Sequence, residues 1–296
     1  MELKKGDLVE NFRIMAELGR GAASIIYLAQ DTKTKQIRAL KHVIKTNPKD
    51  QRFLDQAEAE TKVSKDLNHP GIRTIDRVIR KGSFLSTKEM FLVMELVDGV
   101  SMENQPPKTF EQAVATFEQA ARALAHMHDR GWVHADMKPN NIIVDNYGRA
   151  KVIDLGQACK IGTIKERIQG TPDYIAPEQV HRREITPKTD IYNLGAAMYW
   201  VLTRHHIPTA LAKDTESLVG SIDDALLERP KPAIELNPKI NRHLNDLIMQ
   251  CVEVRPEDRP ESMDLVADKL NLVHGILLAN SSKGKEAVRQ SNAESA

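Results

Sequence analysis

Four side chains that could act on phosphate lie close together near the middle of the chain. The segment 134–141 carries the carboxylate of Asp136, the ammonium of Lys138 and the amide of Asn141, and the carboxylate of Asp154 follows thirteen positions later. A carboxylate can orient a hydroxyl group and accept its proton, and an ammonium can neutralise a phosphoryl group. Amide and carboxylate oxygens are ligands that Mg²⁺ prefers. Each residue alone has an ordinary structural explanation, so it is the spacing of the four that predicts phosphoryl transfer to a hydroxyl.

A glycine-rich turn and a lysine precede this cluster. Gly19 and Gly21 separate the strand-like runs 12–18 and 25–30, and Lys41 lies twenty residues beyond Gly21. Glycine lets backbone N–H groups approach phosphate oxygens closely. Such a turn is usually a simple hairpin, and a lone lysine on a strand is usually solvated. No Gly-Lys-Ser/Thr follows, so the turn is not a P-loop.

The segment 170–178, Gly-Thr-Pro-Asp-Tyr-Ile-Ala-Pro-Glu, is the third motif. Together with 134–141 and 154–156, it resembles the catalytic loop, metal-binding triplet and activation segment of eukaryotic-like (Hanks-type) serine/threonine protein kinases. The runs 92–99 and 176–179 look like those of bacterial members. The resemblance covers residues 12–275.

The resemblance implies an α+β, bilobal protein kinase-like fold. The N-lobe, residues 12–95, would hold five antiparallel strands and one main helix. A hinge over 95–99 would lead to a larger, mostly helical C-lobe over 100–275. Composition predicts a polar, disordered tail over 281–296.

The resemblance also implies roles in catalysis and metal binding. Asp136 would be the catalytic base and Lys138 would neutralise the transferring phosphoryl group. Asn141 and Asp154 would bind Mg²⁺, with Mn²⁺ as the alternative.

Lys41 would hold the α- and β-phosphates of ATP and pair with a carboxylate on the following helix. Glu58 and Glu60 both fit, and the distance to the His-Pro pair at 69–70 selects Glu60. Ser64, one turn further on, is small for its position and suggests a loosely packed helix. The full set implied for ATP binding is Leu18, Gly19, Gly21, Ser24, Ile26, Ala39, Lys41, Glu60, Met94, Glu95, Val97 and Ile143.

Three supporting contacts follow from the same resemblance. Thr171 would hydrogen-bond at the catalytic residues and favour a serine or threonine acceptor. Glu178 would form a buried ion pair with Arg259, and Asp190 would hold the backbone of the catalytic loop. These last three residues are expected to be structural.

One departure bears on regulation. Ala135 stands where most of these kinases carry an arginine that docks an activation-loop phosphate. We therefore hypothesise that activity does not depend on such docking. Thr163, with Lys160, Lys165 and Arg167 nearby, still leaves autophosphorylation open.

Helical periodicity predicts further elements. Helices are expected over 53–67, 110–130 and from the N-cap Thr186 to about Leu202, and near 216–227, 240–252 and 262–278.

Bulk composition narrows the class of protein. The 296 residues include 42 basic and 41 acidic side chains, so no overall field favours nucleic acid or a membrane surface. No apolar run approaches the roughly 18 residues that a membrane span requires. The two cysteines are far apart, which favours a reducing compartment. We expect a cytoplasmic protein whose partners are protein substrates; the oligomeric state is not indicated.

Three other functions compete with an ATP-dependent Ser/Thr protein kinase that also autophosphorylates. A pseudokinase scaffold would keep the fold without the chemistry, yet all four key residues are present. A small-molecule phosphotransferase would not need the 170–178 segment. A purely structural helical adaptor would need none of the catalytic spacing.

Overall fold

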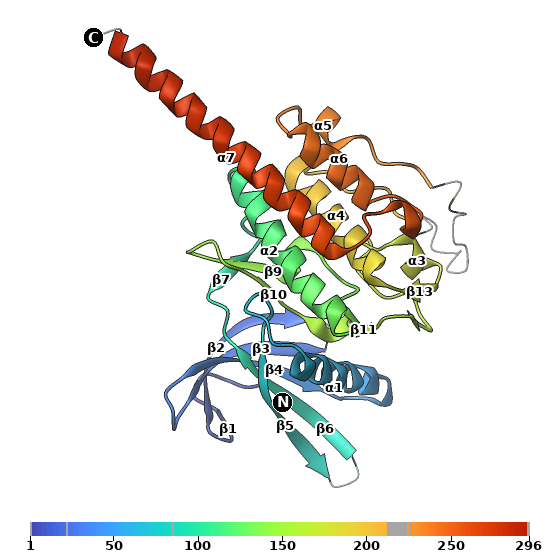
Figure 1. Cartoon of the computed structure of the whole chain (residues 1–296). Coiled ribbons are helices and arrows are strands. Elements are labelled where there is room, and N and C mark those ends of the chain that lie inside the picture. Colours follow the sequence, from blue (N-terminus) through green and yellow to red (C-terminus); the bar gives the residue numbers. More distant parts are fainter. Residues whose placement is uncertain (1, 22, 84–85, 212–223, 225–226, 295–296) are drawn as a thin grey trace. The chain divides into compact units, whose positions relative to one another are not determined.

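The computed structural model describes residues 2–21, 23–83, 86–211, 224 and 227–294 (Figure 1). They form two compact units. The first unit is Met1–Asp98 with Ile153–Ala158, and the second is Gly99–Val152 with Cys159–Ala296. The chain passes from one unit to the other between Asp98 and Gly99, at the end of the predicted hinge. Among the described residues, no helix is long and apolar enough to cross a membrane.

The first unit contains an antiparallel sheet of six strands in the order β1-β2-β3-β4-β6-β5. Five of them, β2 to β6, lie within residues 12–95, as predicted, and a sixth, β1, lies before that range. The extra strand, β1, has only two residues and turns into β2 at Glu10, whose φ is 49°. Two residues are too few for an alternating apolar pattern to show. The strands are β1 Leu8–Val9, β2 Phe12–Gly21, β3 Ser24–Asp31, β4 Ile37–Ile44, β5 Ile75–Ser83 and β6 Ser86–Glu95.

Helix α1, Gln51–Asp66, follows the short 3₁₀ helix η1, Pro48–Asp50, and packs against β4, β5 and β6. Its buried face includes Leu54 and Ala57, which join the apolar cluster of β4 and β6. Ser64 is buried as well, and its hydroxyl oxygen accepts a hydrogen bond of 2.9 Å from the Ile75 amide. A polar contact to β5 thus holds α1 at the position where the small size of Ser64 suggested loose packing.

The opposite face of the sheet has its own core. Phe12, Tyr27, Leu40 and Phe91 belong to one buried cluster on that face. Successive side chains of a strand point to opposite faces. Neighbouring residues of β4 therefore pack into different cores. His42 lies on the same face as Phe91 and stacks on its ring at a centroid distance of 4.0 Å.

The segment Ile153–Ala158 groups with the first unit, although the prediction placed it in the C-lobe. Its 3₁₀ helix η3, Leu155–Gln157, packs against α1. A Cβ at Gly156 would lie 2.7 Å from Gln56 Nε2, so a side chain there would require the end of the Gln56 side chain to move. Sequence adjacency to the catalytic loop concealed this packing.

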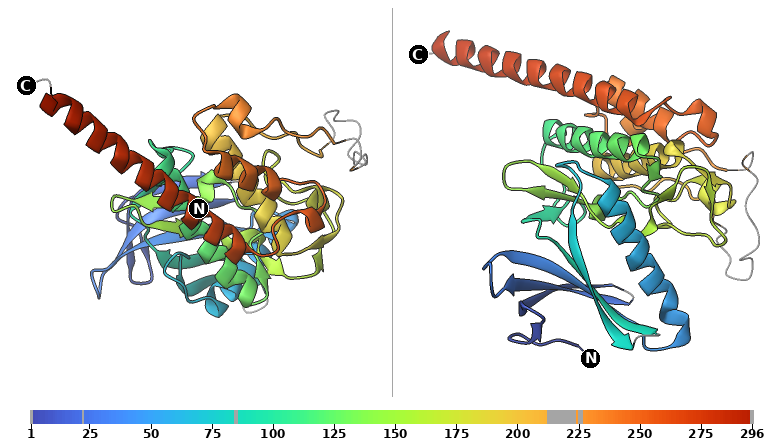
Figure 2. Two further views of the ribbon diagram at one scale, coloured as in Figure 1. Left: turned by 45° about the horizontal axis from the view of Figure 1, so that its top comes forward. Right: turned by 60° about the horizontal axis from the view of Figure 1, so that its bottom comes forward.

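The second unit is built around long helices (Figures 1 and 2). Helix α2, Phe110–Asp129, is capped by Thr109, whose Oγ1 accepts a hydrogen bond of 3.2 Å from the Gln112 amide. It packs against α4, Pro187–Thr203, and α7, Met263–Glu294. The N-cap of α4 is Thr186 with proline at the first helical position, as predicted. The remaining helices are α3 Pro177–Val180, α5 Ala233–Leu236 and α6 Arg242–Cys251, with η2 Pro139–Asn141 and η5 Pro256–Asp258.

Short strands hold the loops of the second unit. β7, Gly99–Ser101, β9, Ile142–Asp145, and β10, Ala150–Val152, form one three-stranded sheet. β8, Trp132–Val133, pairs with β11, Cys159–Lys160, and β12, Thr163–Ile164, pairs with β13, Glu184–Ile185. The segment after Asp154 is thus held by two strand pairs, first by β11 with β8 and then by β12 with β13.

The end of the chain differs from the prediction. Helix α7 continues to Glu294, whereas composition predicted a helix end near 278 and a disordered tail from 281. Residues 281–294 are polar, but they include good helix formers and no proline. Polarity alone therefore did not separate an exposed helix from disorder. The helix predicted near 216–227 lies almost wholly outside the described residues.

Candidate active site

A buried ion-pair cluster surrounds Lys41 in the first unit. Lys41 Nζ lies 2.7 Å from Glu60 Oε2 and 3.5 Å from Asp154 Oδ1. Arg73 Nη2 lies 3.7 Å from the other oxygen of Glu60. Glu58, the alternative partner, instead pairs with Arg80 at 2.9 Å on the exposed side of α1. The structure thus brings together the lysine, the glutamate and the aspartate that the sequence selected.

The charges of this cluster support one another. Burial opposes the charged form of Lys41, but the carboxylates of Glu60 and Asp154 outweigh it, and the pKa of Lys41 is raised above its ordinary value. The ammonium therefore stays charged in a site where only 14% of the side chain is exposed. Such a fixed cation can hold a phosphate group.

A second cluster joins Asp136, Lys138 and Thr171 in the second unit. The Thr171 hydroxyl donates a hydrogen bond of 2.8 Å to Asp136 Oδ1. Lys138 Nζ donates to Thr171 Oγ1 at 2.7 Å and to Asp136 Oδ2 at 3.1 Å. The predicted contact of Thr171 with both residues is confirmed. The three groups form a closed hydrogen-bonded triangle with a hydroxyl at one corner.

The backbone before Asp136 is strained and held from outside. Ala135 has φ 59°, in the left-handed region that costs a non-glycine residue roughly 1–2 kcal/mol. Asp190 on α4 accepts hydrogen bonds from the amides of His134 and Ala135, at 2.9 and 2.8 Å. The predicted role of Asp190 as the holder of this loop is therefore confirmed.

Asp190 also pairs with His128 Nε2 at 2.8 Å. Burial alone would raise the pKa of Asp190, but the contacts with His128, His134 and the loop amides lower it below its usual value. The carboxylate thus remains ionised although it is fully buried.

Asn141 and Asp154 supply the oxygens expected to bind a metal ion. Asn141 Nδ2 donates to the Asp136 carbonyl at 2.8 Å, which fixes the side-chain amide against the catalytic loop. Asp154, in the first unit, has φ 64° and a side chain that is 43% exposed. In the described part of the chain, no three His, Cys, Asp or Glu side chains gather at metal-binding distances. Amide and carboxylate oxygens are each of the kind that a hard cation binds.

The residues predicted to surround ATP fall into several groups. Ile26, Ala39 and Met94 share one apolar cluster in the first unit, and Ala39 lies directly opposite Met94 in the β4–β6 pair. Leu18, on β2, is 51% exposed, and Ile143 lies on β9 of the second unit. Gly19, Gly21 and Ser24 belong to the β2–β3 hairpin, Glu95 ends β6, and Val97 follows it in the segment before β7.

A pocket of about 270 Å³ opens beside the β2–β3 hairpin. Gly21, Ser24 and His42 line it, whereas Lys41 does not. Because His42 and Lys41 are neighbours on one strand, they point to opposite faces of the sheet. The pocket thus lies on the face away from the Lys41 cluster.

Glu178 and Arg259 form the predicted buried ion pair. Arg259 Nη1 and Nη2 contact the two carboxylate oxygens at 2.8 and 2.9 Å, and both side chains are almost fully buried. The pair joins α3 to the segment after η5. Its role is structural, as expected.

The sequence did not reveal two residues that support the site. Arg73 stands beside Glu60, and Gln179 donates to the carbonyl of Ala135 at 2.8 Å. A basic residue after a helix and a glutamine beside a glutamate give no distinctive pattern. Only the fold brings them to these positions.

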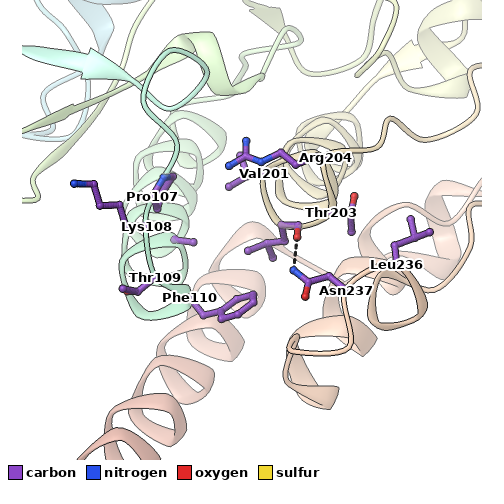
Figure 3. Close-up of a pocket in the computed structure, with 11 residues that line it drawn as sticks. Pro107, Lys108, Thr109, Phe110, Val201, Thr203, Arg204, Leu236 and Asn237 are labelled. Carbon is purple, nitrogen blue, oxygen red and sulfur yellow. Dashed lines mark hydrogen bonds between the residues drawn. The ribbon is translucent and has the colours of Figure 1, made fainter.

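The pocket in Figure 3 lies elsewhere in the second unit, where α2 begins and α4 ends. Its volume is about 320 Å³, and none of the predicted site residues lines it. Thr109 already caps α2, and Asn237 Nδ2 donates to the Leu202 carbonyl at 2.8 Å. These two polar groups are engaged in contacts at the helix ends.

These observations agree with a comparison against known families. The family model described as the protein kinase domain matches residues 12–270. The chain therefore belongs to the protein kinase family, and its α+β fold is the one expected. The family in general uses ATP and a divalent metal ion.

Several curated proteins resemble the chain. The serine/threonine-protein kinase PrkC of Bacillus subtilis is 29% identical over 87% of this chain and 40% of its own length. PknA of Mycobacterium tuberculosis is 27% identical over 88% of this chain and 61% of its own length. The mouse kinase Nek5 is 30% identical over 87% of this chain and 40% of its own length. The chain thus spans about half the length of these relatives.

Proposed function

We propose that the chain transfers the γ-phosphoryl group of ATP to serine or threonine hydroxyls of protein substrates. The hydrogen-bonded triangle of Asp136, Lys138 and Thr171 carries this proposal. It combines a carboxylate that can accept a proton with a cation that can neutralise a phosphoryl group. The names of the bacterial relatives, which are serine/threonine kinases, support it.

In this proposal, Asp136 orients the acceptor hydroxyl and takes its proton, while Lys138 neutralises charge on the transferring group. Thr171 fixes the carboxylate of Asp136 through one hydrogen bond and receives another from Lys138. Because Thr171 fixes Asp136 in one position, we propose that the acceptor is a short serine or threonine side chain.

The residues proposed to hold ATP and metal are those selected by resemblance. Lys41, fixed by Glu60, would hold phosphate oxygens, and Asn141 Oδ1 and Asp154 would bind the metal ion. When bound, the ion would neutralise charge on the phosphates. Oxygen ligands favour Mg²⁺, with Mn²⁺ as the alternative. Leu18, Ile26, Ala39, Met94 and Ile143 would contact the adenine.

Other parts of the proposal rest on composition and resemblance alone. The kinase domain would span 12–275, and the location would be cytoplasmic. Balanced charge argues against a nucleic-acid partner. A pseudokinase scaffold is not favoured, because the four key residues are present.

Transfer of labelled phosphate from ATP to a generic basic protein, with Mg²⁺ or Mn²⁺, tests the proposal. Wild type should label serine or threonine, and Asp136→Asn should do so at least about 100-fold more slowly. Asp246→Asn, a surface change on α6 with 62% of the side chain exposed, is the matched control and should keep full activity. ATP binding without transfer by wild type, or transfer by Asp136→Asn within about tenfold of the wild-type rate, would reject the proposal.

A further inference from the structure

The side chain of Gln179 lies at the junction of four segments of the second unit. Its Nε2 donates to the carbonyl of Ala135 at 2.8 Å and to that of Gln169 at 3.1 Å. Its Oε1 accepts from the amide of Ala176 and from Asn193 Nδ2, each at 3.0 Å. All hydrogen-bonding positions of the amide are thus filled in a side chain that is only 3% exposed.

The orientation of this amide follows from its partners. The backbone N–H of Ala176 can only donate, so Oε1 must face it. The carbonyl groups of Ala135 and Gln169 can only accept, so Nε2 must face them. A carboxylate in the same place would bring negative oxygen against two carbonyl oxygens.

The two carbonyl partners flank the catalytic triangle. Ala135 directly precedes Asp136, and Gln169 lies two residues before Thr171. Asp190 already fixes the amide of Ala135, and Gln179 fixes its carbonyl, so the strained peptide before Asp136 is held at both ends.

The same amide reaches the activation segment through Gln169. Between Gln169 and Thr171, Gly170 has φ 135°, and a Cβ there would lie 3.2 Å from Gln179 Nε2. Glycine therefore gives the segment both its turn and its close approach to the amide.

We propose that Gln179 is a positioning residue for phosphoryl transfer: its amide sets the directions of Asp136 and Thr171 relative to one another. The link needs no phosphorylated residue, which fits the absence of an arginine at Ala135. The inference rests on the proposed function, since it takes Asp136 as the residue that contacts the acceptor.

Two variants separate the chemistry of the side chain from its size. Gln179→Glu keeps the shape and loses the donor, and Gln179→Met keeps the length and loses every hydrogen bond. Misplacement of a catalytic group by about 1 Å can cost about 100-fold, so we expect kcat to fall about 10- to 100-fold in both variants. Affinity for an ATP analogue, measured by calorimetry, should change less than about twofold, because Lys41 and Glu60 are untouched.

Gln119→Glu is the matched control. Gln119 is also a part-buried glutamine that donates to two carbonyls, those of Ala115 and Gly148, and accepts from the Ala150 amide. It lies on α2, outside the catalytic triangle. Its loss should lower the melting temperature and leave kcat of the folded protein unchanged.

A double variant distinguishes positioning of Asp136 from a purely structural role of Gln179. In the Asp136→Asn background, Gln179→Met should lower the residual single-turnover rate less than about threefold, because residues that act as a unit are not additive. Full activity of both Gln179 variants, additive losses in the double variant, or failure of both to fold at low temperature would overturn the inference. An inactive wild type would instead reject the proposed function.

Discussion

The buried ion pair of Glu178 and Arg259 predicts a large and measurable loss of stability. Every N–H of the Arg259 guanidinium donates a hydrogen bond. Two go to the Glu178 carboxylate, and the others go to the carbonyls of Glu253, Lys188 and Val254. Thr189 Oγ1 adds a hydrogen bond of 2.9 Å to the carboxylate. The change that tests this arrangement is Glu178→Gln, which keeps the shape and removes the charge.

The expected cost follows from these contacts. The change weakens one charge-assisted hydrogen bond and removes another, because an amide NH₂ cannot accept from the guanidinium; each bond is worth about 1.5–3 kcal/mol. Removing one partner of a buried pair costs about 3–5 kcal/mol in general. Because Arg259 keeps three carbonyl partners, we expect the free energy of unfolding to fall by about 3 kcal/mol, the lower end of that range.

Urea unfolding followed by tryptophan fluorescence measures this cost. The chain has two tryptophans, Trp132 and Trp200, and both lie in the second unit with the ion pair. Arg255→Met, which removes an exposed arginine four residues before Arg259, is the control and should leave the midpoint unchanged. Glu178→Leu with Arg259→Met should cost less than the sum of the single changes. A loss below about 1 kcal/mol in Glu178→Gln would refute the reasoning.

Three further predictions address the charges near the site and in the sheet. Lys41→Met should lower kcat/KM for ATP by about 100-fold or more in steady-state assays, because Glu60 and the phosphates lose their cation; a loss below tenfold would contradict this role. Thr163→Ala and phosphatase-treated wild type should keep kcat within about twofold, because Ala135 offers no guanidinium to dock a phosphate. Complete inactivity would reject this prediction. Burial, aided by Lys81 and opposed by Glu89, lowers the pKa of His42 below 6.5. The unfolded chain therefore binds a proton that the folded chain does not, and stability should fall as the pH drops from about 6.5, by at most about 1.4 kcal/mol per pH unit. Chemical denaturation at several pH values should show this component in wild type and not in His42→Gln; equal slopes would refute it.

Local spacing explains why much of the site could be predicted. Asp136, Lys138 and Asn141 lie within six residues, so one loop must place them together. Glu58 and Glu60 are two positions apart and point to different sides of α1, so only one of them can face Lys41.

Contacts made through the backbone could not be predicted in this way. Gln179 donates to two carbonyl groups, and a carbonyl belongs to every residue type, so the partners leave no trace in the sequence. The packing of η3 on α1 was missed for a similar reason. It brings Gly156 close to the end of the Gln56 side chain, and an isolated glycine in a sequence has many explanations.

Two residues with left-handed backbones show that the residues proposed to do chemistry and the residues that fix their geometry lie in different parts of the sequence. Ala135 and Asp154 both have left-handed backbones without being glycine, with φ of 59° and 64°. Such conformations persist only where the surroundings hold them. Asp190 and Gln179 hold the first, and the packing of η3 on α1 accompanies the second. The residues proposed to do chemistry can therefore be read from a short motif, whereas the groups that fix their geometry come from α1, α3 and α4.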